Sequence, residues 1–533
     1  MRFPFFRKKE TGPVIRKRAE HTISRKNIAP EALSVLYRLS DAGFISYLVG
    51  GSVRDMLLGR QPKDFDVATD AYPRQIKKLF RNAFLIGRRF RLALICFKDR
   101  QIETSTFRRE PDETEAEDDG RPGALYRSED NLFGTPEQDA QRRDFTVNGL
   151  FYDIKTFDVI DYVGGLEDLE RHILRSIGDP NVRFREDPVR MMRAVRFATK
   201  LGFDIHRDSE KAILRHHAEI GNASPPRLFE EILRLFTVGA APAFRLLNDL
   251  KLMGDLLPAV AAHVKASGGR RSPLWGLLEA FDAHAEDPLH DDHGLCFATL
   301  LHPLFADRLR AAAKAGDQPA PETIAAELVG DALVNPFAAR TWAPPRSVCE
   351  AVANILAAQA RLDADDPQIR RPRMISRDWF PAAALLWRIR TEASGGDLGR
   401  VAELEKAVRK GNRTARAMHA DFEEGRRPKS ERPQPEVKGP KSDNSKGRKS
   451  GRGRSPGSPK PQPSETQTPK TQTPKNPAEA APETPAVQGS ESEAGQGDAP
   501  AEQGAAPRRR HRRRGGRRHH RGGGNAEQAI GGT

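Results

Sequence analysis

The chain has 533 residues and a formal net charge of +15, but only 37% of its residues are hydrophobic. No run of 18 apolar residues occurs, which excludes a transmembrane helix, and the three cysteines lack the spacing of a zinc site or a disulfide framework. Residues 1–26 carry a net charge of +7 and residues 425–533 carry +12, whereas the middle carries −4. Such basic ends indicate a polyanionic partner, most often nucleic acid. Without a secretory signal we expect a reducing, cytoplasmic location.

The first patterned region alternates short helices and strands, which predicts a mixed α/β domain. Ser52 is the expected N-cap of the second helix, and Gly59 lies just past its end. The expected elements in chain order are a helix over 30–42, a strand over 47–51, a helix over 52–58, a strand over 64–69, a helix over 72–81, and a hairpin of strands 90–97 and 101–107.

From Leu166 to about Glu424 the pattern is almost wholly helical, so the fold class is α+β. The remaining segment is rich in Arg, Gly and Pro, contains no aromatic residue and is expected to be disordered. The expected organisation is a basic N-terminal extension (1–26), a mixed α/β domain (27–165), two successive helical segments (166–257 and 258–424) and the disordered tail (425–533).

Two glycines separate the expected strand from the helix that follows it. Gly50 and Gly51 let the backbone approach a ligand closely, and the helix start after them, at Ser52, suits a phosphate group. Arg54 can add a charge-assisted fork to the same phosphates. Alone, the glycine pair indicates no more than a tight turn.

Asp64 and Asp66 stand two residues apart on the next expected strand, which places both carboxylates on one face. Such a pair suits Mg²⁺, and two such ions serve phosphoryl transfer. An isolated D-x-D is usually a solvated strand edge. Its position directly after a phosphate-type turn makes the combination much more specific.

A third acid is expected to complete this site, and two residues are candidates. Glu103 lies on the second hairpin strand, where its carboxylate can face Asp64 and Asp66. Asp144 lies in the segment QRRDFTVN; the alternative for it is a structural ion pair with an arginine. The sequence leaves the choice open.

A fourth element begins at Asp187, where Asp-Pro predicts a helix start. Arg190, Arg193 and Arg196 recur every three residues on this helix. Arg190 can donate to a ring acceptor of adenine while an acid accepts from its exocyclic amine. From spacing alone, however, an N-cap followed by a solvated basic face is the favoured interpretation.

Taken together, these residues are similar to the bacterial poly(A) polymerase and CCA-adding enzyme family, class II of the DNA polymerase β-like nucleotidyltransferases. The resemblance extends from about His21 to Leu257. Three features resemble the poly(A) polymerase branch: IGRRFRLA (86–93), HTISRKNI (21–28) and the basic C-terminal extension. The motifs that carry the resemblance are VGGSVRDMLLGRQPKDFDVAT (49–69), QRRDFTVNGLFYD (141–153), DYVGGLEDL (161–169) and REDPVRMMRAVRFA (185–198).

The resemblance implies a nucleotidyltransferase head (27–165), a neck (166–257) that binds the nucleotide base and RNA, a helical body (258–424) and a tail (425–533). It also assigns roles to the candidate residues. Asp64 and Asp66 match the family's metal-binding aspartates, and an acid at Glu103 matches its third carboxylate. Gly51 and Arg54 match its triphosphate contacts. Arg143 and Asp144 match the motif for the incoming ribose and the catalytic centre, and Asp187, Arg190 and Arg193 match its nucleotide-base contacts.

The expected reaction is template-independent transfer of AMP from ATP to RNA 3′ ends with release of pyrophosphate, assisted by two Mg²⁺ ions. The expected partners are RNA and RNA-decay proteins, with no membrane insertion, and the chain is expected to be a monomer. The basic ends would hold the RNA backbone. The alternatives are a CCA-adding enzyme acting on tRNA and a noncatalytic RNA-binding protein.

Overall fold

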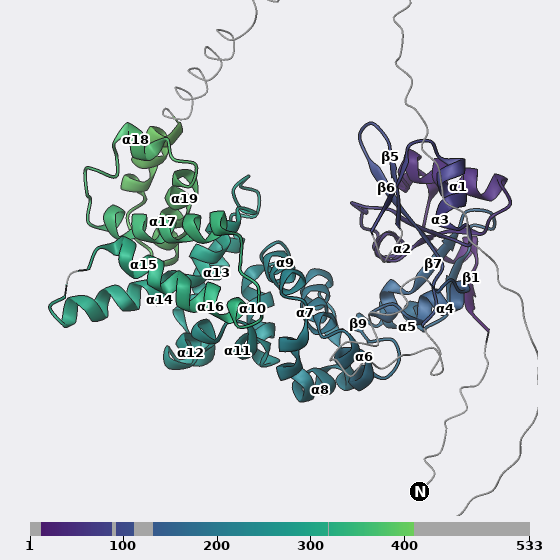
Figure 1. Cartoon of the computed structure of the whole chain (residues 1–533), viewed down its shortest axis with the longest axis horizontal. Helices are drawn as coiled ribbons and strands as arrows, with labels where there is room; N and C mark the ends of the chain where they lie inside the picture. Colours follow the sequence, from purple (N-terminus) through teal and green to yellow (C-terminus); the bar gives the residue numbers. More distant parts are fainter. Residues whose placement is uncertain (1–11, 88–91, 111–131, 318, 410–533) are drawn as a thin grey trace, which may run out of the picture. The chain divides into compact units, whose positions relative to one another are not determined.

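One mixed β-sheet organises the N-terminal part of the computed structural model, which describes residues 12–87, 92–110, 132–317 and 319–409. Within these ranges eight strands form the sheet in the order β1-β8-β7-β2-β3-β6-β5-β4. Figure 1 labels β1, β5, β6 and β7 of this sheet. The strands are β1 (Val14–Arg16), β2 (Ser46–Val49), β3 (Asp66–Thr69), β4 (Ala83–Ile86), β5 (Leu92–Cys96), β6 (Gln101–Thr106), β7 (Leu150–Asp153) and β8 (Val159–Asp161).

The register of the central strands brings several sequence motifs to one edge of the sheet. β2 is antiparallel to both β3 and β7, so Val49 is the partner of both Asp66 and Phe151. β3 is parallel to β6, which places Glu103 beside Asp66. The end of β2 and the starts of β3 and β7 therefore meet where the glycine turn leaves the sheet.

Alternating side chains of these strands enter two different cores, as the two-residue period of a strand requires. Leu48 and Val67 enter the large core, which also receives side chains of α1. Val49, Ala68 and Phe151 enter a small core on the opposite face with Ala140 of α4. The helices of this region are α1 (Pro30–Asp41), α2 (Gly51–Leu57), α3 (Pro73–Leu79), α4 (Pro136–Gln141) and α5 (Gly165–Glu170).

Three local expectations differ from the structure. The basic segment 1–26 contributes β1 to the sheet edge, and Ile23 is fully buried in the large core. Helix α2 begins at Gly51, so Ser52 is not its N-cap; the Ser52 hydroxyl donates to the Val49 carbonyl oxygen at 3.1 Å instead. Strand β3 begins at Asp66, so Asp64 lies in the loop before the strand rather than on it.

Helices dominate the rest of the described chain, which confirms the α+β class. A short parallel pair, β9 (Ile173–Leu174) and β10 (Asp204–Ile205), interrupts them. No helix in the described part combines the length and apolarity needed to cross a membrane. The expected boundaries at 165, 257 and 424 stay predictions, and the expected disordered tail (425–533) lies outside the described residues.

The neck helices are α6 (Pro180–Glu186), α7 (Val189–Leu201), α8 (Arg207–His216), α9 (Pro225–Phe236), α10 (Ala240–Asp249) and α11 (Leu252–Leu256). The body helices are α12 (Pro258–Ala266), α13 (Pro273–Asp282), α14 (His293–Lys314), α15 (Pro321–Val329), α16 (Asn335–Ala338), α17 (Arg346–Asp363), α18 (Pro372–Ile375) and α19 (Phe380–Ala393). Val189, Met192 and Val195 of α7 are buried, as their spacing predicts.

Candidate active site

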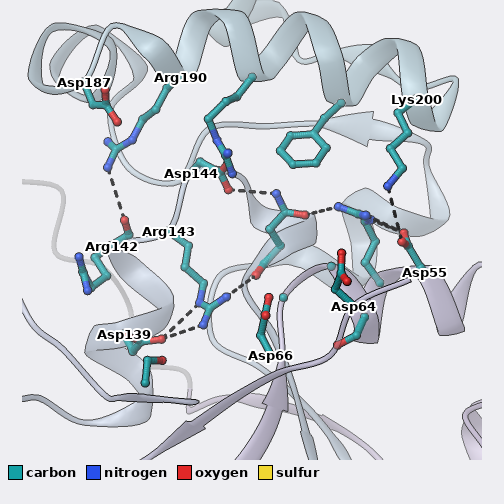
Figure 2. Close-up of a pocket in the computed structure, with 18 of the residues that line it drawn as sticks. Asp55, Asp64, Asp66, Asp139, Arg142, Arg143, Asp144, Asp187, Arg190 and Lys200 are labelled. Carbon is teal, nitrogen blue, oxygen red and sulfur yellow. Dashed lines mark hydrogen bonds and ion pairs between the residues drawn. The ribbon is translucent and has the colours of Figure 1, made fainter. Parts of the chain in front are cut away.

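A cavity of about 570 Å³ lies between the sheet edge and α7 (Figure 2). Eleven of the twelve predicted site residues line it, and Glu103 does not. Its described lining contains nine lysines and arginines but six aspartates, so the cavity carries a positive balance that suits a polyphosphate. The predicted residues that line it are Gly50, Gly51, Ser52, Arg54, Asp64, Asp66, Arg143, Asp144, Asp187, Arg190 and Arg193.

The turn between β2 and α2 requires glycine at its first position. Gly50 has φ of +72°, a region that side-chain-bearing residues rarely adopt, and its N–H donates to the Leu150 carbonyl oxygen at 3.1 Å. A Cβ at this position would lie 3.0 Å from Nη1 of Arg143. The glycine therefore allows the backbone and the Arg143 guanidinium to lie side by side at the cavity wall.

Asp64 and Asp66 both line the cavity on its sheet side, opposite Arg190 and Lys200 of α7 (Figure 2). Among the described residues, no donor is hydrogen-bonded to either carboxylate. Surrounding atoms desolvate Asp66, and the nearby charges of Glu103 and Asp64 add to this. Desolvation and these two negative charges outweigh the opposing effect of the Arg143 charge, and they raise the pKa of Asp66 to about 6. This cluster of unneutralised oxygen ligands is a favourable environment for an added cation.

The two candidates for the third acid have different surroundings. Glu103 is exposed and is the strand partner of Asp66. The Asp144 side chain is only 10% exposed, and its Oδ2 lies 2.6 Å from Nη2 of Arg193. Its Oδ1 accepts hydrogen bonds from the Asn148 side chain at 3.0 Å and the Phe145 N–H at 2.8 Å. Burial alone would raise the pKa of Asp144, but Arg193 and these hydrogen bonds lower it to about 2.

Arg54 is held by protein partners at the cavity wall. Its side chain is only 2% exposed, and its Nε donates to Oδ1 of Asp55 at 2.8 Å. Its Nη1 donates to Oδ1 of Asn148 at 2.5 Å, and the guanidinium lies over the Phe197 ring. Asn148 therefore links Arg54 to Asp144 and fixes the position of both charged groups.

The two predicted base-reading residues lie together at one end of the cavity. Both oxygens of Asp187 accept hydrogen bonds from Arg227 of α9, at 3.0 and 2.9 Å. Arg190 is buried, and its guanidinium donates to the carbonyl oxygens of Arg183 at 3.3 Å and Arg142 at 3.5 Å (Figure 2). Spacing alone favours a solvated basic face for α7, but in the structure Arg190 and Arg193 line the cavity.

Several lining residues were not among the predicted set. Arg227 follows Asp187 by forty positions, and no spacing rule connects the two. Asn148 stands in the quoted motif QRRDFTVN, but its bridging role depends on tertiary contacts. Lys200 lies 3.9 Å from Asp55, and desolvation lowers its pKa. Among the other unpredicted lining residues are Lys63, Ser105, Arg142 and Asp139.

No preformed metal cage exists in the part of the chain that the structure describes: three or more acidic, histidine or cysteine side chains do not converge there. The donor set at the sheet edge nevertheless fits a hard cation. Asp64 and Asp66 offer carboxylate oxygens at the cavity that have no hydrogen-bond donor among the described residues, and Glu103 is the strand partner of Asp66.

Residues 46–175 match the family model described as poly A polymerase head domain. Residues 202–264 match one described as a probable RNA and SrmB-binding site of polymerase A. The cavity residues on the sheet side lie within the first match, and α7 (Val189–Leu201) lies between the two matches. Both matches agree with the family that the sequence motifs predict.

Individual relatives agree with this family. Poly(A) polymerase I of Escherichia coli O6:H1 is 45% identical over 294 residues, which cover 54% of this chain and 62% of that protein. The CCA-adding enzyme of Lactobacillus helveticus is 38% identical over 260 residues, or 46% of this chain and 62% of that protein. The chain thus spans about three fifths of the length of these curated relatives. A solved structure of Bacillus stearothermophilus CCA-adding enzyme with CTP is 26% identical, with a TM-score of 0.49, over 72% of this chain and 83% of that one.

Proposed function

Because residues 46–175 belong to the poly(A) polymerase head-domain family, we propose that this chain is a template-independent polynucleotide adenylyltransferase. It transfers AMP from ATP to RNA 3′ ends and releases pyrophosphate. The observation that carries the proposal is the cavity itself, in which Asp64 and Asp66 face a wall of arginines and lysines. This is the charge arrangement that nucleotidyl transfer needs, because the substrate is polyanionic and its reacting phosphate carries negative charge.

Asp64 and Asp66 are the residues that would hold Mg²⁺, with ATP as the nucleotide substrate. When bound, a pair of such ions lowers the pKa of the 3′-hydroxyl and offsets the charge on the leaving pyrophosphate. The chain itself positions the reactants. Lys63, Lys200 and the α2 end of the cavity bind the triphosphate, and Arg54 acts through its contacts with Asp55 and Asn148.

The reaction forms a bond between the RNA 3′-oxygen and the α-phosphorus, and breaks the bond from that phosphorus to the oxygen bridging to the β-phosphate. Arg143, held by Asp139 at 3.0 Å, lies where the ribose and α-phosphate would bind. Arg190 and Asp187 would contact adenine, with Arg227 fixing the Asp187 carboxylate. No covalent enzyme intermediate is needed.

We assign the third carboxylate to Glu103 rather than Asp144. Glu103 is next to Asp66 and contributes to its raised pKa, whereas Asp144 is neutralised by Arg193. Glu103→Gln is therefore expected to lower the single-turnover rate of AMP incorporation by about 100-fold, with no change in melting temperature. The matched control is Asp99→Asn, because Asp99 is an exposed acid in the turn of the same β5–β6 hairpin. Full activity of Glu103→Gln would contradict the assignment.

Incorporation of each nucleotide separately tests the function. With a single-stranded RNA primer, ATP alone is expected to give long ladders, and CTP, GTP and UTP little or no extension. A tRNA that lacks its 3′ end is the second substrate, because the match to a CCA-adding enzyme favours that function as the alternative. A stop after C-C-A would establish the CCA-adding activity. RNA binding without incorporation of any nucleotide would favour a noncatalytic RNA-binding protein.

RNA is the proposed polymer partner, with the match at residues 202–264 as support. The basic segments at the two ends, most of which lie outside the described residues, would add sequence-independent contacts with its backbone. A cytoplasmic location, a monomeric state and RNA-decay proteins as partners remain part of the same proposal.

A further inference from the structure

A second cavity, of about 830 Å³, lies in the body among α12, α13, α14, α17 and α19. These helices contact one another along the chain's helical region (Figure 1). The volume is within the range of sites that bind small organic molecules. Most of the lining lies beyond residue 264, outside both family matches, so no role is assigned to it by them.

Two histidines line this cavity, and one of their ring nitrogens is buried without a partner among the described residues. Nδ1 of His263 lies 3.1 Å from a carboxylate oxygen of Asp307, whereas its Nε2 is buried without a hydrogen-bond partner among the described residues. The imidazole of His302, on α14, lines the same cavity and is half-buried. Desolvation, with Arg390 and Arg310 nearby, lowers its pKa well below the ordinary value. Its neutral ring therefore offers one donor and one acceptor.

An arginine stacked on a tryptophan forms another part of the lining. The guanidinium of Arg400 lies over the Trp387 ring at 5.6 Å from its centroid. Trp387 is fixed from the other side, because its Nε1 donates to Asp363 at 3.1 Å. The Arg400 side chain is 40% exposed, so its plane can support another flat ring. Guanidinium planes and neutral hydrogen-bonding side chains are groups that bind unstacked nucleobases.

The balanced charge of the lining favours a nucleotide within a strand over a free mononucleotide. Three arginines and three aspartates line the cavity, so with neutral histidines the formal charges balance. A free mononucleotide carries two negative charges at its phosphate, whereas a phosphodiester within a strand carries one. Arg310 is ion-paired with Asp307, but its side chain is 67% exposed, so it can also contact a single phosphodiester.

We propose that the body cavity binds one nucleotide of a single-stranded RNA, with the base beside Arg400 and the two histidines and the phosphodiester beside Arg310. This site deepens the proposed function, because it would hold the RNA at a distance along the strand from its 3′ end. It does not depend on catalysis, so binding can be measured in the absence of ATP and Mg²⁺.

Gly276 provides a direct way to fill the cavity. It lines the cavity in α13, and a Cβ built there meets no atom within 4 Å. The first side-chain atom of Gly276→Leu therefore meets no obstacle outside its own helix, and we expect the leucine side chain to occupy part of the cavity. Gly254 is also open around its Cβ and does not line the cavity, so Gly254→Leu is the matched control.

The probe is a 3′-deoxy-terminated oligoadenylate that carries 8-azidoadenosine, applied to the full-length chain. We expect photocrosslinks within 302–310 and 387–400 in the wild type and in Gly254→Leu, and at least a tenfold loss of these crosslinks in Gly276→Leu. Arg310→Ala should weaken them in the same direction. Unchanged crosslinks in Gly276→Leu, or crosslinks confined to other regions, would overturn the proposal.

A second experiment distinguishes binding of a nucleotide within RNA from binding of a free mononucleotide. Crosslinking with 8-azido-AMP that Gly276→Leu abolishes, without any oligoadenylate crosslink at the same peptides, would overturn the assignment to RNA in favour of a free nucleotide. Failure of AMP incorporation with these crosslinks intact would contradict the proposed reaction but not the body site. The two inferences are thus tested separately.

Discussion

Asp66→Asn is expected to reduce AMP incorporation by at least about 10³-fold, because it removes one of two carboxylates proposed to hold the metal that supplies several kcal/mol of transition-state stabilisation. The substitution should not destabilise the fold. The Asp66 carboxylate has no hydrogen-bond donor among the described residues, and the surrounding atoms and acids raise its pKa to about 6. Replacing it by a neutral amide relieves repulsion, so the melting temperature should stay the same or rise.

This opposite effect on activity and stability makes the experiment informative. Rates are measured under single-turnover conditions with saturating ATP and RNA, and thermal unfolding is followed by circular dichroism. Asp64→Asn should behave in the same way, and Asp99→Asn should match the wild type in both measurements. An Asp66→Asn protein with wild-type incorporation would exclude Asp66 from the reaction. A marked fall in melting temperature would show that the carboxylate has a structural partner.

The elements of the head were predictable because each has a local cause. Gly50 and Gly51 end a strand and open a helix, and Pro30 and Pro73 stand at the first turns of α1 and α3. The alternation of Leu48 and Val49 between the two cores follows from strand geometry. These signals act over a few residues, so a single sequence contains them.

The contacts that complete the site are of a different kind. Arg227 reaches Asp187 from another helix, and Asn148 joins Arg54 to Asp144 across the sheet edge. Such pairs depend on how helices and strands pack, which local patterns do not encode. The same reason explains β1: Val14 and Ile15 are followed by basic residues, so composition assigned them to an extension, whereas pairing with β8 places them in the sheet.

Glu103 combines features that the sequence predicts with a position that only the tertiary structure reveals. Its place on a strand was predictable, and so was its availability as a third acid. Its position directly beside Asp66 depends on the parallel register of β3 and β6. The choice between Glu103 and Asp144 therefore needed the three-dimensional arrangement, in which Asp144 is already paired with Arg193.

Asp144→Asn is expected to destabilise the chain by about 2 kcal/mol at neutral pH, since a pKa lowered from 3.8 to about 2 corresponds to that much linked stability. The side chain is only 10% exposed, so solvent does little to screen its pairing with Arg193. Loss of the charge leaves Arg193 near Glu231, whose carboxylate lies 3.7 Å away, as its remaining partner. Urea denaturation followed by circular dichroism measures the difference.

The pH dependence identifies the cause of that destabilisation. The pKa of Asp144 is lower in the folded chain than in the unfolded chain, so its contribution is complete above pH 4 to 5 and is lost as the pH falls toward 2. The difference between wild type and Asp144→Asn should therefore fall to about half at pH 3. A difference that stays constant between pH 7 and pH 3 would show that lost packing or hydrogen bonds, rather than the buried charge, account for the effect. Asp99→Asn should show no difference at either pH, because Asp99 is exposed in a hairpin turn.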